Sequence, residues 1–153
     1  MELIRRFAPE QYVAALEQWE WAGISSLTPV FTSPFGDVFF SDADGAYWYL
    51  DTVAGQLTRE WDSGAELQAA VNTRDGQDQF LMVALAEAAS ANGIEPDQDQ
   101  VLSFVVPPVL GGQLDPANLG ASDFVVTLDL LGQIHRQVKD LPPGTQISGV
   151  NLG

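Results

Sequence analysis

The stretch DVFFSDADGAYWYLDT, residues 37–52, decides the fold of this chain. Two runs rich in aromatic residues flank the turn sequence DADG at residues 42–45. An Asp-Gly pair between β-favouring segments is typical of a β-hairpin, because glycine tolerates the positive φ that such turns require. The sequence therefore predicts antiparallel strands over Asp37–Phe40 and Ala46–Asp51.

The neighbouring segments extend this hairpin in both directions. A second turn near Ala54-Gly55 predicts a third strand over Gln56–Glu60, so the three strands form a meander. Upstream, Pro9 suits the first turn of a helix that Gly23 ends. Prolines and glycines between that helix and the hairpin predict a loop with a short extended piece. The apolar residues of the helix recur at helical spacing: Tyr12, Val13, Leu16 and Trp19.

The second half of the chain is predicted to be mainly helical. Ser63 and Glu66 have the spacing of a capping box, which predicts a helix over Gly64–Asn72. Apolar residues from Phe80 onward predict a longer helix that Asn92-Gly93 closes. The compact apolar run Val101–Val106 predicts a buried strand that ends at two prolines.

The last third holds a long loop, a strand and a short C-terminal helix in this prediction. The loop covers Val109–Ser122, and apolar residues at every second position then predict a strand over Phe124–Leu130. Leu131, Ile134, Val138 and Leu141 mark one stripe of a short helix. The fold class is α+β, with helices packed on an antiparallel sheet in a single domain of residues 1–153.

The composition limits the function. The chain of 153 residues has a formal net charge of −15, six basic residues and no cysteine. Such charge repels nucleic acid and anionic lipid, and it favours a basic partner; solubility or adaptation to salt is the alternative explanation. Missing cysteine excludes disulfides. We find no signal peptide and no apolar stretch near the roughly 20 residues that span a bilayer, and we expect a cytoplasmic protein.

Catalytic and metal motifs are weak. His135, the only histidine, has no cysteine partner and no nucleophile elbow upstream, so a half-buried structural role is favoured over catalysis. Asp42 and Asp44 begin like a calcium loop, but the remaining ligands are missing. Gly111-Gly112 lacks the lysine and helix of a phosphate loop. The sequence predicts no metal site and no cofactor, and the chain is not expected to be an enzyme.

Two segments resemble a known family. The block PPVLGG at Pro107–Gly112, followed by LGQIHRQVKDLPPGT at Leu131–Thr145, resembles the C-terminal domain of bacterial type VI secretion immunity proteins. The segment FGDVFFSDADGAYWYLDTVAGQL at Phe35–Leu57 is similar to the GAD-like region that precedes that domain. The resemblance divides the domain into a GAD-like part, residues 1–62, and an immunity-like part, residues 63–153.

The resemblance implies a non-catalytic protein that binds and neutralises a cognate toxin of the nuclease type. A nuclease must grip phosphates and is basic around its active site, so an acidic inhibitor complements it. Two alternatives remain open: a small-ligand or regulatory module with a pocket near the GG loop and His135, and a hydrolase that uses His135 with carboxylates. The residues expected to bind the partner are Asp37, Asp42, Asp44, Asp51, Glu60 and Asp62, with His135 and Arg136 as donors to acidic groups.

Overall fold

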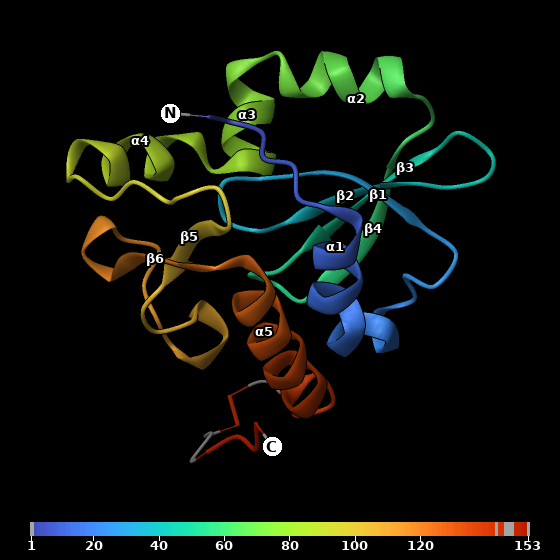
Figure 1. Cartoon of the computed structure of the whole chain (residues 1–153). Helices are drawn as coiled ribbons and strands as arrows, with labels where there is room; N and C mark the ends of the chain where they lie inside the picture. The colour runs from blue at the N-terminus through green and yellow to red at the C-terminus, as the bar shows by residue number, and fades with distance from the viewer. Residues whose placement is uncertain (1, 143, 146–148, 153) are drawn as a thin grey trace.

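A computed structural model of the chain describes residues 2–142, 144–145 and 149–152 and has a four-stranded antiparallel sheet at its centre (Figure 1). The three strands of the predicted meander are confirmed as β2, β3 and β4. The short extended piece before them is a further strand, β1, because it pairs with β2 along the hairpin. The strands are adjacent in chain order and comprise β1 Thr28–Thr32, β2 Val38–Ser41, β3 Tyr47–Asp51 and β4 Gln56–Trp61.

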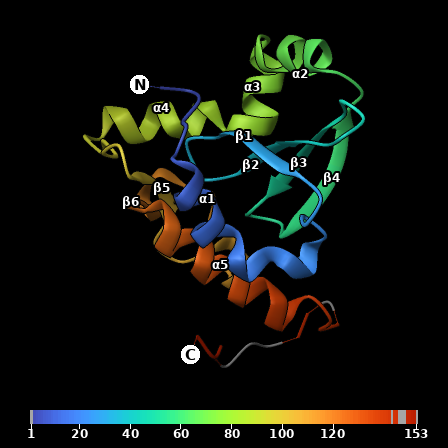
Figure 2. The same cartoon turned by 45° about the vertical axis from the view of Figure 1, so that its right-hand side comes forward.

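Helices cover both faces of this sheet. Successive residues of a strand face opposite sides. Val38 and Phe40 are buried in one core cluster, whereas Phe39 between them belongs to a second cluster. Figure 2 shows α1 and α5 on one side of the sheet and α2 and α3 on the other. The consecutive aromatic residues of the hairpin are therefore core residues of a three-layer arrangement.

The first face is covered by the N-terminal helix and the C-terminal helix. α1 (Pro9–Leu16) starts at the predicted proline and continues as the 3-10 helix η1 (Glu17–Ala22). Gly23 ends η1 with a φ of +95°, as predicted. The indole Nε1 of Trp19 donates to the carbonyl oxygen of Leu128 on α5 at 2.8 Å. This bond ties two helices that are far apart in the sequence.

The C-terminal helix α5 (Phe124–Val138) contradicts the predicted strand at its start. Asp123 caps the helix, because its carboxylate accepts a hydrogen bond from Val126 N at 3.0 Å. Phe124 and Leu128 are fully buried at helical spacing, whereas Val126 is 57% exposed. The apolar run satisfies both a strand and a helix period. The cap and the packing on α1 and η1 select the helix.

The second face is covered by two shorter helices. α2 (Gly64–Val71) has the predicted cap, since Ser63 Oγ accepts from Glu66 N at 3.2 Å. The single long helix predicted after it is wrong. Two helices, α3 (Arg74–Leu81) and α4 (Val83–Ala91), meet at Met82, whose φ of 46° lies in the left-handed region. A residue in that conformation ends one helix and starts the next in a new direction.

A two-stranded sheet lies beside α4 and α5. β5 (Gln100–Phe104) confirms the predicted buried strand over most of its length. It pairs with β6 (Leu119–Asp123), which falls within the segment predicted as loop. The small residues of β6 have weak strand propensity, so only the buried partner strand makes them extended. The 3-10 turns η2 (Pro108–Leu110) and η3 (Pro116–Asn118) lie between the two strands.

The core crosses the predicted division between residues 62 and 63. One cluster joins Phe39 and Tyr49 of the meander to Leu67 and Phe80 of the helices. Another joins Val38, Phe40 and Leu50 to residues of β5 and α5. The two sequence parts therefore share their hydrophobic contacts.

Candidate partner-binding site

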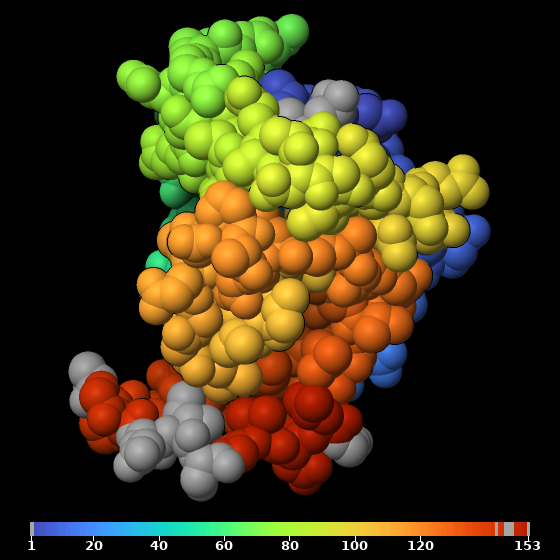
Figure 3. Space-filling model, turned by 90° about the vertical axis from the view of Figure 1, so that its left-hand side faces the viewer, coloured from blue at the N-terminus to red at the C-terminus, as the bar shows by residue number. Residues whose placement is uncertain are grey.

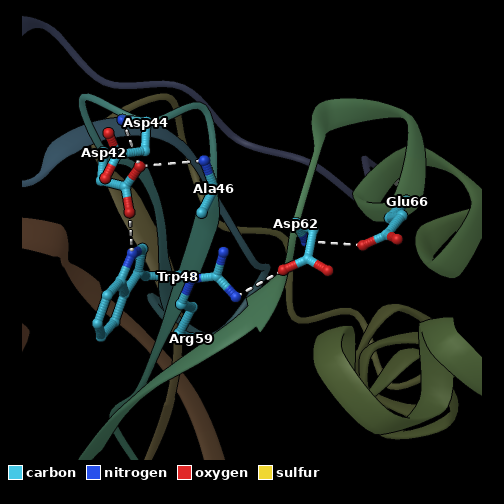
Figure 4. Close-up of polar contacts among 7 residues, drawn as sticks. All are labelled: Asp42, Asp44, Ala46, Trp48, Arg59, Asp62 and Glu66. Atoms are coloured by element: carbon cyan, nitrogen blue, oxygen red, sulfur yellow. Dashed lines mark hydrogen bonds and ion pairs between the residues drawn. The ribbon is translucent and has the colours of Figure 1, made fainter.

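The turn between β2 and β3 is built around one carboxylate. Asp42 Oδ1 accepts hydrogen bonds from the backbone N–H of Asp44 at 2.9 Å and of Ala46 at 3.0 Å. Its Oδ2 accepts from the indole Nε1 of Trp48 at 2.9 Å (Figure 4). This indole bond, followed by the backbone bonds, lowers the pKa of Asp42. The side chain therefore stays ionised while it holds the turn in place.

The end of β4 lies next to this turn. Tyr47, the first residue after the turn region, pairs with Trp61 at the end of β4. The following residue, Asp62, accepts an ion-pairing hydrogen bond from Arg59 at 2.6 Å. The backbone N–H of Asp62 donates to the carboxylate of Glu66 at 2.7 Å. Figure 4 shows the turn and the β4–α2 junction side by side.

Four of the eight predicted residues are gathered here. Glu60 is exposed at a β-bulge in β4, because Tyr47 pairs with Trp61 and Trp48 pairs with Arg59. Only one cation, Arg59, stands among five carboxylates, and Asp62 already engages it. We call this group the hairpin-end acidic surface, and its carboxylates are Asp42, Asp44, Glu60, Asp62 and Glu66.

Glu66 was recognised from the sequence only as a capping residue. Its carboxylate faces the backbone of Asp62, so the cap places it on the hairpin-end acidic surface. The Ser-x-x-Glu signal directly after Asp62 contains enough information to predict this position. A capping glutamate next to a strand end therefore contributes charge to the same surface as the strand.

The opposite end of the sheet buries its carboxylate. Asp37 is 1% exposed, and its carboxylate accepts three hydrogen bonds. Ser33 Oγ donates to Oδ2 at 2.8 Å, while the N–H and the hydroxyl of Thr52 donate to Oδ1 at 2.8 and 2.7 Å. Asp37 joins β2 to the β3–β4 turn and presents no charge to a partner in this conformation.

Burial also controls the ionisation at this end. Desolvation raises the pKa of Asp37 to about 6, nearby Asp51 raises it further, and the three donors act in the opposite direction. Asp51 itself accepts from the N–H groups of Val53 and Ala54, at 2.9 and 3.0 Å, and so supports the turn. Both aspartates are thus tied to the turn by their hydrogen bonds.

His135 belongs to the same buried network. Its Nε2 donates to the carbonyl oxygen of Thr52 at 2.8 Å, and its ring packs 5.6 Å from the ring of Trp19. Burial lowers the pKa of His135. A Cβ at Gly55 would lie 2.3 Å from His135 Nδ1, so the glycine allows the turn to approach the ring. Arg136, the next residue, is exposed on the surface of α5.

A cavity of about 600 Å³ lies between β5, β6 and α5, on the side that Figure 3 faces. Its walls are mostly apolar and include Pro107, Pro108 and Leu110 of the predicted GG block. Ser103 and Ser122 share a hydrogen bond of 2.9 Å in this wall. His135 and Arg136 are not among its lining residues. The predicted pocket therefore lies near the GG loop but does not converge on the histidine.

Two further findings concern the described part of the chain. It holds no group of three or more His, Cys, Asp or Glu side chains arranged to hold a metal ion. It also contains no helix with the length and apolar character needed to cross a membrane.

The comparison with known families supports the resemblance seen in the sequence. Residues 65–135, just under half of the chain, match the family model described as "T6SS immunity protein Tdi1, C-terminal". The match confirms the predicted similarity to type VI secretion immunity proteins. It begins in α2 and ends in α5, so it covers Glu66 and His135 but leaves out the meander.

Solved structures share the fold. The crystal structure of Atu4351 from Agrobacterium tumefaciens superposes with a TM-score of 0.63 at 18% sequence identity. The match covers 86% of this chain but 66% of the Agrobacterium chain, so this chain spans just under two thirds of that structure. At this identity the likeness concerns the fold alone. No curated protein matches the chain in sequence.

Proposed function

We propose that this chain is an immunity-type binding protein that blocks a cognate toxin without catalysing a reaction. The match over residues 65–135 supports the immunity role. The observation that carries the binding mode is the hairpin-end acidic surface, where five carboxylates surround the single cation Arg59. Asp44 and Asp62 are exposed, so they reach a partner without a change of conformation.

The chemistry of a nuclease-type toxin fits this surface. An enzyme that cleaves nucleic acid presents lysine and arginine to phosphates, and a carboxylate surface competes for those side chains. Attraction between opposite charges also speeds the encounter and weakens as salt rises. A cytoplasmic complex with a basic toxin is therefore the partner that we propose.

The location of His135 argues against a hydrolase. Its Nε2 is bonded to the Thr52 carbonyl, and its ring lies between Trp19 and the β3–β4 turn. A general base must reach the proton of a substrate or water. We therefore assign this histidine to the structure of the buried network.

Charge reversal with a matched control tests the proposal. The chain is co-expressed with each toxin encoded beside its gene, and rescue of growth and complex formation are measured. The triple variant Asp44→Lys, Glu60→Lys, Asp62→Lys should lose rescue and the salt dependence of binding. The control variant, with the same change in net charge on α1 and η1, carries Glu10→Lys, Glu17→Lys and Glu20→Lys. Equal binding of both variants would refute a role for the hairpin-end acidic surface.

The cavity beside the GG loop supports a second candidate, binding of a small apolar ligand. Its volume of about 600 Å³ is typical of ligand pockets, and its walls are mainly apolar. Native mass spectrometry of the purified protein would reveal a retained small molecule. A Val126→Trp variant, with a bulkier side chain at the cavity wall, should then lose that ligand.

A further inference from the structure

The two outer edges of the central sheet differ. The edge of β1 is closed by the N-terminal segment, because Arg5 and Thr32 exchange backbone hydrogen bonds of 2.8 Å in both directions. The outer edge of β4 pairs with no other strand of the described residues. Figure 2 shows β4 at the margin of the sheet. Its outward backbone groups are therefore available to another chain.

Strand β4 lacks the common devices that protect an exposed edge. Natural edge strands are often short or carry proline, lysine or a bulge in their middle. β4 is the longest strand of its sheet, and it contains neither proline nor lysine. Its pairing with β3 is regular from Gln56 to Arg59, and the bulge is confined to Glu60 near the end. A straight, accessible stretch of edge remains.

The charge beside this edge indicates what can pair with it. Glu60 lies on β4, Asp62 follows it, and Asp44 lies in the adjacent turn. A second copy of this chain would bring another net charge of −15 and its own Glu60 to the same place. An extended segment rich in lysine or arginine instead meets carboxylates along its length.

We propose that an extended, cationic segment of the partner protein adds as a strand to the outer edge of β4. Backbone hydrogen bonds to β4 hold the segment, and its basic side chains contact the hairpin-end acidic surface. This inference rests on the proposed function and adds the mode by which the partner binds.

A designed peptide provides the first test. The probe is a short peptide of alternating lysine and valine, and its twin carries D-valine, which keeps the charge but prevents ordinary strand pairing. Hydrogen exchange of the intact protein should show protection of amides in Gln56–Trp61 by the probe. We expect the probe to bind at least about tenfold more tightly than its twin. Equal affinities, no binding, or protection elsewhere would overturn the inference.

A pair of variants separates the edge from general charge effects. Thr58→Lys places a lysine on the exposed edge of β4, and Thr28→Lys makes the same change on the exposed start of β1. The first should weaken binding of the probe about tenfold, while the second should leave it unchanged. Equal effects, or protection of β4 that appears without peptide as protein concentration rises, would contradict pairing with a partner strand.

The toxin complex distinguishes this inference from the function on which it rests. If a toxin binds and is neutralised while β4 amides exchange as in the free protein, the edge inference fails and the proposed function stands. If no toxin is bound although the peptide protects β4, the proposed function fails and the edge remains a peptide-binding strand.

Discussion

The two ends of the central meander hold the same residue type in opposite roles. At the β2–β3 end, Asp44 and Asp62 are exposed and their charges face solvent. At the other end, Asp37 is 1% exposed and its carboxylate is filled by three donors. An aspartate on a sheet is therefore a binding group or a structural group according to what covers it. The difference teaches that charge counted from the sequence overstates the charge that a partner meets.

The largest expected effect comes from removing the buried carboxylate. Asp37→Ala leaves Ser33 Oγ and both donors of Thr52 without their acceptor, so we expect a loss of about 4 kcal/mol in the free energy of unfolding. Urea denaturation of the variant and the parent measures this difference. A loss as small as that of a surface aspartate would contradict the contrast between the two ends.

The pH dependence of stability should also come from the buried end. The pKa of Asp37 is raised from 3.8 to about 6 in the folded protein. The folded state thus keeps a proton that the unfolded chain has lost, and this contribution is fully present below the unfolded pKa. It is lost as pH rises through the folded pKa, with a change of about 3 kcal/mol. Asp37→Asn removes the proton from both states.

Unfolding curves at a series of pH values test this sign. The parent should lose stability relative to Asp37→Asn as the pH rises from 4 to 7, where about 6 is the midpoint. Parallel pH profiles of the two proteins would show that Asp37 does not titrate in this window.

Two glycines form a matched pair at the two ends. Gly45 and Gly55 both have positive φ, +84° and +71°, so alanine is strained at either position. A Cβ at Gly45 meets nothing within 4 Å, whereas a Cβ at Gly55 would overlap His135. Gly55→Ala should cost about 2 kcal/mol more than Gly45→Ala, because only the former forces the histidine ring to move. Equal melting temperatures would remove His135 from the buried network.

The smallest effect is expected at the hairpin-end acidic surface. Asp44→Asn and Asp62→Asn should each change the free energy of unfolding by no more than about 0.5 kcal/mol, because exposed charges and ion pairs contribute little. Thermal unfolding measures the stability, and the salt dependence of toxin binding measures the lost charge. Strong destabilisation would show that this end is structural as well.

The parts of the fold that were predicted correctly depend on local signals. The Asp-Gly turn, the Ser63 cap and the Gly23 helix end are each determined within one turn of the chain. The errors lie where local signals conflict or vanish. The apolar run from Phe124 suits a strand or a helix, and the small residues of β6 favour neither. Met82 carries no helix-breaking signal, yet its left-handed conformation divides α3 from α4.

The candidate site was predicted in part for a similar reason. The turn placed Asp42 and Asp44 together, and the strand order placed Asp62 next to them. The sequence contained no indication that Asp37 is enclosed, because its partner Thr52 lies 15 positions away. It also did not indicate that His135 bonds to a carbonyl 83 positions away.

The amino-acid sequence alone determined the meander, the helix caps, the acidic net charge and the resemblance to immunity proteins. These properties arise from neighbours along the chain or from composition, so they exist before the chain packs. Tertiary structure alone decided which carboxylates are buried, where α5 begins and which edge of the sheet is open. Those outcomes depend on desolvation and on contacts between distant segments, and both arise only when the layers come together.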